Sequence, residues 1–112
     1  MLYVISAILV FLLIYIFPIV KVCGDSMFPT LYDGDIILTC RLYKLKVDSV
    51  YVYESPEEKG KFVIKRLKDI SDGRLYLVGD NLDNSYDCRH YGPVRGSSIK
   101  CKYLCILRKV LN

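Results

Sequence analysis

The chain opens with an unbroken apolar run. Residues 2–20 contain no charged side chain and are almost wholly hydrophobic. At about 1.5 Å per helical residue, such a run nearly crosses a hydrocarbon core of about 30 Å. Residues 1–20 contain no Lys or Arg and no A-x-A cleavage site follows, which favours an uncleaved anchor over a secretory signal. We therefore predict a transmembrane helix in a domain of residues 1–20, kinked or ended by Pro18.

After residue 20 the pattern changes to short alternating stretches separated by turn residues. No stretch there has a convincing helical period of 3.6 residues. Turns are predicted at Tyr32-Asp33-Gly34 and Ser71-Asp72-Gly73, and an ordered loop over residues 79–94. The predicted strands cover residues 35–40, 47–53, 61–68, 74–78 and 99–107. The fold class is therefore mainly β: a small antiparallel domain over residues 21–112, behind one N-terminal helix.

Composition and charge narrow the function classes. The chain is 53% hydrophobic and carries a net charge of +4, with both signs interspersed after residue 20. No basic block of the kind that binds nucleic acid is present, so we expect no nucleic-acid partner. The single histidine and the spacing of the five cysteines do not make a zinc site, and we predict neither metal nor cofactor.

Ser26 is the first candidate for chemistry. It lies in the stretch Gly24-Asp25-Ser26-Met27-Phe28-Pro29-Thr30-Leu31, which by itself is either a turn leaving the apolar segment or a nucleophile turn. A serine nucleophile needs a base to take its proton. His90 could serve in a triad, although nothing in its local sequence supports that role.

Lys65 is the other candidate base. In an extended strand it shares a face with Val63 and Leu67, so its amine could lie among apolar neighbours, where desolvation lowers its pKa. The alternative is an exposed strand lysine, with Ile64 on the buried face. The spacing alone does not decide between the two.

A third polar segment runs from Gly79 to Gly92. Asp87 and Arg89 are spaced for an ion pair that fixes a loop, and Asp80 suits a tight turn. Ser85 supplies a hydroxyl that could hold a lysine amine. A calcium site is the competing interpretation, but the segment lacks the twelfth-position Glu and central Gly of an EF-hand loop.

These three segments, in this order, resemble the type I signal peptidases, membrane-bound serine proteases that remove signal peptides from exported proteins. Residues 26–31 resemble the nucleophile motif S-M-x-P-T-L of that family. Residues 62–66 resemble its general-base motif, in which a lysine precedes an arginine. Residues 79–92 resemble its motif G-D-N-x-x-N-S-x-D-S-R-x-x-G, with Cys88 where the family usually has serine.

The resemblance implies a Ser-Lys dyad, with Ser26 as nucleophile and Lys65 as general base. It further implies a backbone N–H of Ser26 that stabilises the oxyanion, and no serine hydroxyl donor at Gly24. By the same resemblance, Ser85 would orient the Lys65 amine, and Asp87 with Arg89 would brace the loop by an ion pair, with Asp80 as a second structural acid. The substrate would bind as an extended strand beside Val63 and Ile64. Shallow pockets lined by Met27, Leu31 and Ile64 would accept small side chains.

The implied function is cleavage of signal peptides from exported precursors at the lipid bilayer, by a domain on the extracytoplasmic side of the cell membrane. The short segment from Asp69 to Val78 has no room for the large inserted domain of some relatives. Two alternatives remain: a dedicated maturation peptidase for a single exported substrate, and a non-catalytic, membrane-anchored β domain that binds peptides. A soluble self-cleaving repressor-type protease would need a DNA-binding domain upstream.

Overall fold

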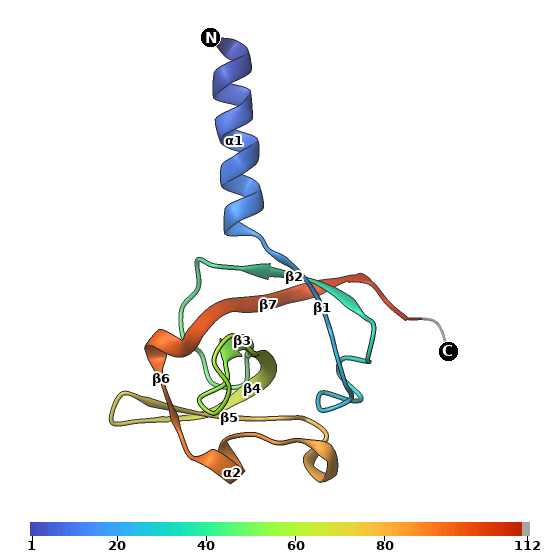
Figure 1. Ribbon diagram of the computed structural model, residues 1–112, viewed down its shortest axis with the longest axis vertical. Helices are drawn as coiled ribbons and strands as arrows, with labels where there is room; N and C mark the ends of the chain where they lie inside the picture. The colour runs from blue at the N-terminus through green and yellow to red at the C-terminus, as the bar shows by residue number, and fades with distance from the viewer. Residues whose placement is uncertain (111–112) are drawn as a thin grey trace.

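The computed structural model describes residues 1–110, which form one apolar helix and one β domain (Figure 1). The helices are α1 (Leu2–Ile16) and α2 (Cys88–Tyr91), with short 3-10 turns at Leu82–Asn84 and Gly96–Ser98. The strands are β1 (Ile19–Lys21), β2 (Ile36–Cys40), β3 (Val50–Glu54), β4 (Phe62–Ser71), β5 (Arg74–Val78), β6 (Val94–Arg95) and β7 (Ile99–Arg108).

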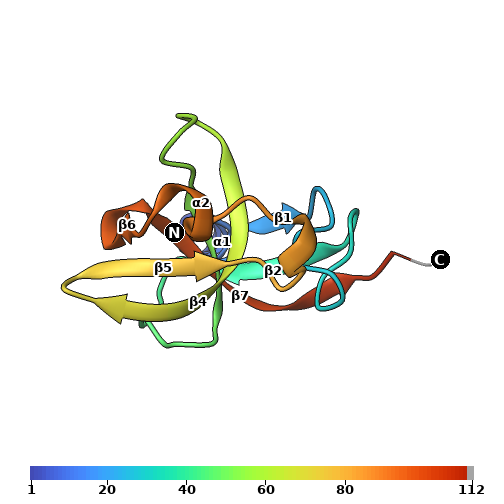
Figure 2. The same cartoon turned by 90° about the horizontal axis from the view of Figure 1, so that it is seen from below.

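The strands form a single seven-stranded sheet in the order β1-β2-β7-β3-β4-β5-β6. Every neighbouring pair is antiparallel. The sheet is strongly curved, so that β4 and β5 pass beneath β2 and β7 (Figures 1 and 2). The predicted antiparallel β domain is therefore present, and all five predicted strands overlap an observed one.

The predicted transmembrane helix is wrong. α1 has 15 residues, about 22 Å at 1.5 Å per residue, and within residues 1–110 no helix is long and apolar enough to cross a membrane. The apolar run is longer than the helix because Pro18 restricts the residue before it, and Phe17 leaves the helical conformation with φ −118° and ψ 75°. Ile19 and Val20 then pair with β2 as strand β1.

α1 projects away from the sheet and buries none of its side chains (Figure 1). Its last turn is tied to the end of β2. The Nε of Arg41 donates to the Tyr15 carbonyl at 2.7 Å, and the Arg41 backbone N–H donates to the Ile16 carbonyl at 2.8 Å. These donors satisfy carbonyls that have no partner inside the helix.

The hydrophobic core of the β domain consists of two apolar clusters. The first lies between β3, β4, β5 and β7 and includes Tyr51, Tyr53 and Leu67. The second holds Met27 and Leu31, from the segment between β1 and β2. Ser26 directly precedes a member of the second cluster and Lys65 lies two residues before a member of the first, so the packing of both clusters positions the candidate site.

Candidate active site

Ser26 and Lys65 are in direct contact. Lys65 Nζ donates a hydrogen bond to Ser26 Oγ over 2.7 Å, although 39 residues separate them in the chain. Ser26 lies in the turn after β1, and Lys65 lies in the first half of β4. This distance is in the range that proton transfer between a nucleophile and its base requires.

The surroundings of Lys65 favour its neutral form. The residue is only 5% exposed. Burial lowers the pKa of Lys65 below its ordinary value of 10.5, and the positive charges of Lys61 and Arg89 act in the same direction, while Asp87 opposes them. Of the two interpretations that the sequence allows for Lys65, a buried amine and an exposed strand lysine, the structure therefore shows the buried one. A lysine with a lowered pKa holds less charge near neutral pH, which is what a general base needs.

The turn that carries Ser26 is fixed from two sides. Met27 and Leu31 are 1% and 0% exposed, so the turn is anchored in the core directly after Ser26. On the other side, the Asn81 backbone N–H donates to the Ser26 carbonyl at 2.8 Å, and Asn81 Nδ2 donates to the Asp25 carbonyl at 3.0 Å. The start of the polar loop thus holds the backbone carbonyls of Ser26 and of the residue before it.

Gly79 is required for this approach. An ideal Cβ at position 79 would lie 2.6 Å from the Ser26 carbonyl oxygen and 2.2 Å from Ser85 Oγ. Both separations are too short for any real Cβ contact, so a side chain at this position would push the loop away from the nucleophile turn.

Ser85 and Arg89 converge on Asp87, which is completely buried. Asp87 accepts from the Gly79 N–H at 2.9 Å, from Ser85 Oγ at 2.7 Å and from Arg89 Nε at 2.9 Å. Burial alone raises the pKa of the Asp87 carboxyl, but these hydrogen bonds outweigh it and hold the pKa well below its usual range. In this geometry the hydroxyl proton of Ser85 is directed at Asp87, and the hydroxyl oxygen keeps its capacity to accept from a lysine.

Asp80 is held by a different arginine. Arg66, the neighbour of Lys65 on β4, donates to both carboxylate oxygens of Asp80 at 2.8 Å, and Thr30 Oγ1 donates to the same carboxylate. Hydrogen bonding by Arg66 holds the pKa of Asp80 below its usual value. The ion pair links β4 to the polar loop, and the hydrogen bond from Thr30 links both to the turn that carries Ser26.

A cleft of about 180 Å³ opens beside Ser26 and Lys65. Ser26 and Lys65 lie in its lining together with three of the predicted substrate-binding residues: Met27, Val63 and Ile64. Leu31, the fourth, is packed in the second core cluster beneath the turn.

Unpaired strand edges flank this cleft. Residues 62–65 of β4 pair with β3 on one side, whereas pairing with β5 begins only at Arg66. β1, whose end also lines the cleft, pairs only with β2. The described part of the chain therefore leaves one backbone edge open on each side.

The backbone N–H of Ser26 is also available. Within residues 1–110 it donates to no acceptor, whereas the neighbouring Gly24 N–H is bound by Asp33 Oδ1 at 2.8 Å. A free N–H on a serine nucleophile would be a suitable donor to a developing oxyanion.

The residues that a histidine triad or a calcium site would use are engaged in other contacts in the structure. His90 Nδ1 accepts from the Asp87 N–H at 3.2 Å as part of the α2 capping box, and its ring stacks on Tyr86. Asp80 and Asp87, whose carboxylates a calcium site in this segment would use, are each paired with an arginine.

Sequence reasoning missed the supporting roles of Arg66 and Thr30. Strand alternation does indicate that the Arg66 side chain lies on the opposite face of β4 from Lys65. Its partner Asp80 could not be identified, since the bidentate pair depends on where the chain goes after β5. Asn84 likewise donates to Asp25 Oδ1 at 2.6 Å from a loop that has no periodic pattern.

Comparisons with known proteins agree with this arrangement. A family model described as Peptidase S24-like matches residues 17–100. The mitochondrial ATP-independent inner membrane protease subunit 1a of Arabidopsis thaliana is 32% identical over 117 residues, covering 80% of this chain and 70% of that protein. Mitochondrial inner membrane protease subunit 1 of Schizosaccharomyces pombe is 31% identical, with 80% and 73% covered. The mouse protein of that name is 27% identical, and the chain spans 63% of its length. The predicted family resemblance is confirmed.

Proposed function

Because the chain belongs to the Peptidase S24-like family, we propose that it is a serine endopeptidase in which Lys65 activates Ser26. The observation that carries the proposal is the 2.7 Å contact between Lys65 Nζ and Ser26 Oγ, with the lysine buried. A peptide-binding domain without catalytic activity would need neither the contact nor the burial of an amine.

In the proposed mechanism, neutral Lys65 takes the hydroxyl proton of Ser26 as Oγ attacks the carbonyl carbon of the scissile bond. The Ser26 N–H donates to the oxyanion of the tetrahedral intermediate. Lys65 then returns the proton to the leaving amine, which gives an acyl-enzyme on Ser26. Water, deprotonated by Lys65, hydrolyses this ester and restores the dyad.

The substrate is proposed to bind as an extended strand in the cleft. The unpaired edges of β1 and of residues 62–65 in β4 support this mode, because main-chain hydrogen bonds can form on either side of an added strand. The small cleft volume beside Met27 and Ile64 suits small side chains next to the scissile bond.

Exported precursor proteins are the proposed substrates, cleaved at their signal peptides, and a membrane is the proposed place of action. The names of the relatives, which are inner membrane proteases, support an association with a membrane. A general signal peptidase and a peptidase dedicated to one precursor share this site. The extracytoplasmic side remains a prediction from the signal-peptidase resemblance.

Cleavage of a secretory precursor by the purified chain in detergent tests the proposal. Wild type is expected to cut the precursor at one position. Ser26→Ala and Lys65→Ala should each lower the cleavage rate by about 10³-fold or more. Exposed residues supply matched controls: Ser97→Ala and Lys59→Ala should cleave at the wild-type rate. Equal activity in Ser26→Ala and wild type would refute a Ser26 nucleophile, and an inactive wild type would refute the choice of substrate or the peptidase activity.

A further inference from the structure

We propose that the cleft selects extended peptides that carry a carboxylate side chain three to five residues from the scissile bond, and that Lys61 and Lys21 recognise this carboxylate. The inference rests on the proposed function and adds a substrate class to it. Its basis is the charge of the cleft and the distance along β4 between the dyad and the lysines.

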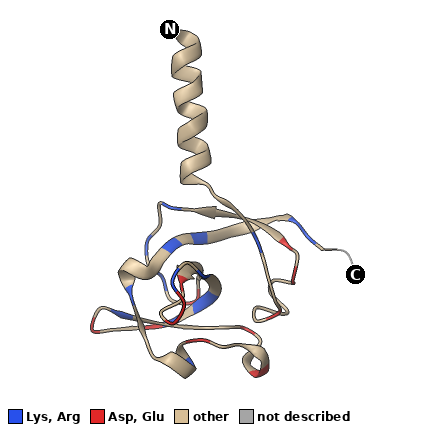
Figure 3. Ribbon diagram, in the orientation of Figure 1, with Lys and Arg blue, Asp and Glu red and all other residues tan. Residues whose placement is uncertain are grey.

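The charge of the cleft has one sign. Among its described lining residues, the only charged side chains are lysines: Lys21, Lys61 and Lys65. Elsewhere in the β domain acidic and basic residues are interspersed (Figure 3). With Lys65 committed to Ser26, the two outer lysines are left to act on whatever occupies the cleft.

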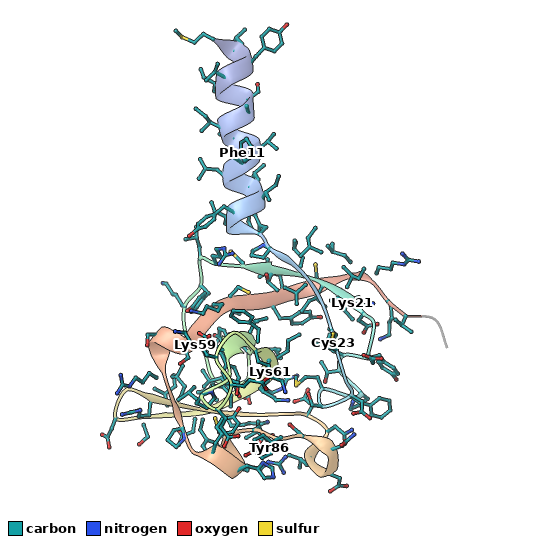
Figure 4. The ribbon with its side chains drawn as sticks, viewed as in Figure 1. Phe11, Lys21, Cys23, Lys59, Lys61 and Tyr86 are labelled. Carbon is teal, nitrogen blue, oxygen red and sulfur yellow. The ribbon has the colours of Figure 1, made fainter. Side chains whose placement is uncertain are left out.

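The two lysines come from opposite walls of the cleft. Lys21 is the last residue of β1, and Lys61 directly precedes the first residue of β4. Figure 4 shows Lys21 and Cys23 on the β1 side and Lys61 towards β4. A peptide strand between the two open edges would pass between these side chains, and one carboxylate could reach either amine.

The position of the carboxylate follows from strand geometry. Lys61 lies four residues before Lys65, which is about 13 Å at 3.3 Å per residue. A peptide with its scissile carbonyl at Ser26 therefore reaches the level of Lys61 about four residues away. Long side chains broaden this to three to five residues, and the positions adjacent to the scissile bond are too close to the dyad.

Both amines are available to a ligand. Lys61 pairs with Glu58 at 3.6 Å, but their side chains are 60% and 68% exposed, and exposed pairs of this kind contribute little. Lys21 is exposed and has no ion-pair partner within residues 1–110. Lys59, two residues before Lys61, lies outside the cleft lining and serves as a matched control.

The test uses peptide pairs that differ only by Glu or Gln, scanned from five residues before to five residues after the scissile bond. For wild type, kcat/KM should favour Glu by about three- to fivefold at one position three to five residues away, mainly through KM. Lys61→Gln should reduce this preference and Lys21→Gln/Lys61→Gln should reduce it to less than about twofold, whereas Lys61→Arg should keep it and Lys59→Gln should leave it unchanged. Added salt should weaken it.

Binding separates this inference from the proposed function. In fluorescence anisotropy, Ser26→Ala should bind the labelled Glu peptide more tightly than the Gln peptide, and Ser26→Ala/Lys21→Gln/Lys61→Gln should bind the two equally. Where wild type cleaves none of the peptides, the peptidase proposal fails and these affinities alone decide the carboxylate preference. The inference would be overturned by equal affinities for the Glu and Gln peptides at every position. A preference for Glu confined to the residues next to the scissile bond would also overturn it.

Discussion

At the scale of single residues, the absence of a side chain at Gly79 is as important to the site as the dyad itself. The loop can donate from Asn81 to the Ser26 carbonyl only because nothing projects from position 79. Gly79 has no requirement for a left-handed backbone, so the constraint is contact, and the sequence motif could not reveal which atoms it protects.

Gly79→Ala is predicted to impair both folding and catalysis. The new methyl group must displace the Ser26 carbonyl or Ser85, at a cost of about 1–3 kcal/mol in the free energy of unfolding. Thermal unfolding and kcat/KM measure the two effects. Gly96→Ala is the control, because an added Cβ there meets nothing within 4 Å. Wild-type activity in Gly79→Ala would show that the close approach is not needed.

Lys65 shows how far sequence reasoning reached at this scale. The alternation of β4 placed Lys65 with Val63 and Leu67 but left its burial open. The structure resolves it, with Leu67 fully buried and Lys65 at 5% exposure. Burial depends on the turn after β1 covering this face, a contact between segments that periodicity cannot encode.

Lys61→Gln should shift the pH dependence of cleavage. The positive charge of Lys61 helps to lower the pKa of Lys65, so its removal raises that pKa and moves the acid limb of kcat/KM to higher pH. The measurement is kcat/KM from pH 5 to pH 9 at low salt, with Lys59→Gln as control. A shift towards lower pH would contradict this electrostatic coupling.

At the scale of elements, the strands were predictable and the short pieces between them were not. Alternating apolar residues with Gly-containing turns marked β2, β3, β4, β5 and β7. β1 was hidden because it continues an apolar run, and α2 and β6 were missed because four and two residues are too few to show a period.

Asp87 connects these short pieces, as N-cap of α2 and as acceptor from Gly79 at the end of β5. Since its pKa is lowered in the folded state, its contribution to stability is fully present above the unfolded value of about 3.9 and is lost as pH falls below it.

Asp87→Asn is therefore predicted to be less stable at pH 7 and to lose less stability than wild type on acidification. Urea unfolding at pH 7 and pH 3 provides the comparison, and the exposed Asp83→Asn is the control. An acid sensitivity identical to that of wild type would exclude Asp87 as its source.

At the scale of the whole molecule, the five cysteines are all free. Cys40, Cys88 and Cys101 are buried, and Cys23 and Cys105 are exposed. The native protein is predicted to react rapidly with Ellman's reagent at two thiols, and the three others should react only on unfolding. Five fast thiols, or fewer than five after unfolding without reductant, would contradict this distribution.

The length of the N-terminal helix was the main error of sequence reasoning at this scale. Hydropathy over residues 2–20 measured a run of apolar side chains, whereas the helix ends at Ile16 because Pro18 disfavours a helical backbone at Phe17. The remaining apolar residues become β1, which both joins the sheet and forms a wall of the cleft.

The central claim, that buried Lys65 is the general base for Ser26, is tested most directly by the pH dependence of kcat/KM for wild type. Lys65 must be neutral to accept the proton, so the rate should rise with pH and level off above a pKa below the ordinary 10.5. A rate that is flat from pH 5 to pH 9 would contradict the claim.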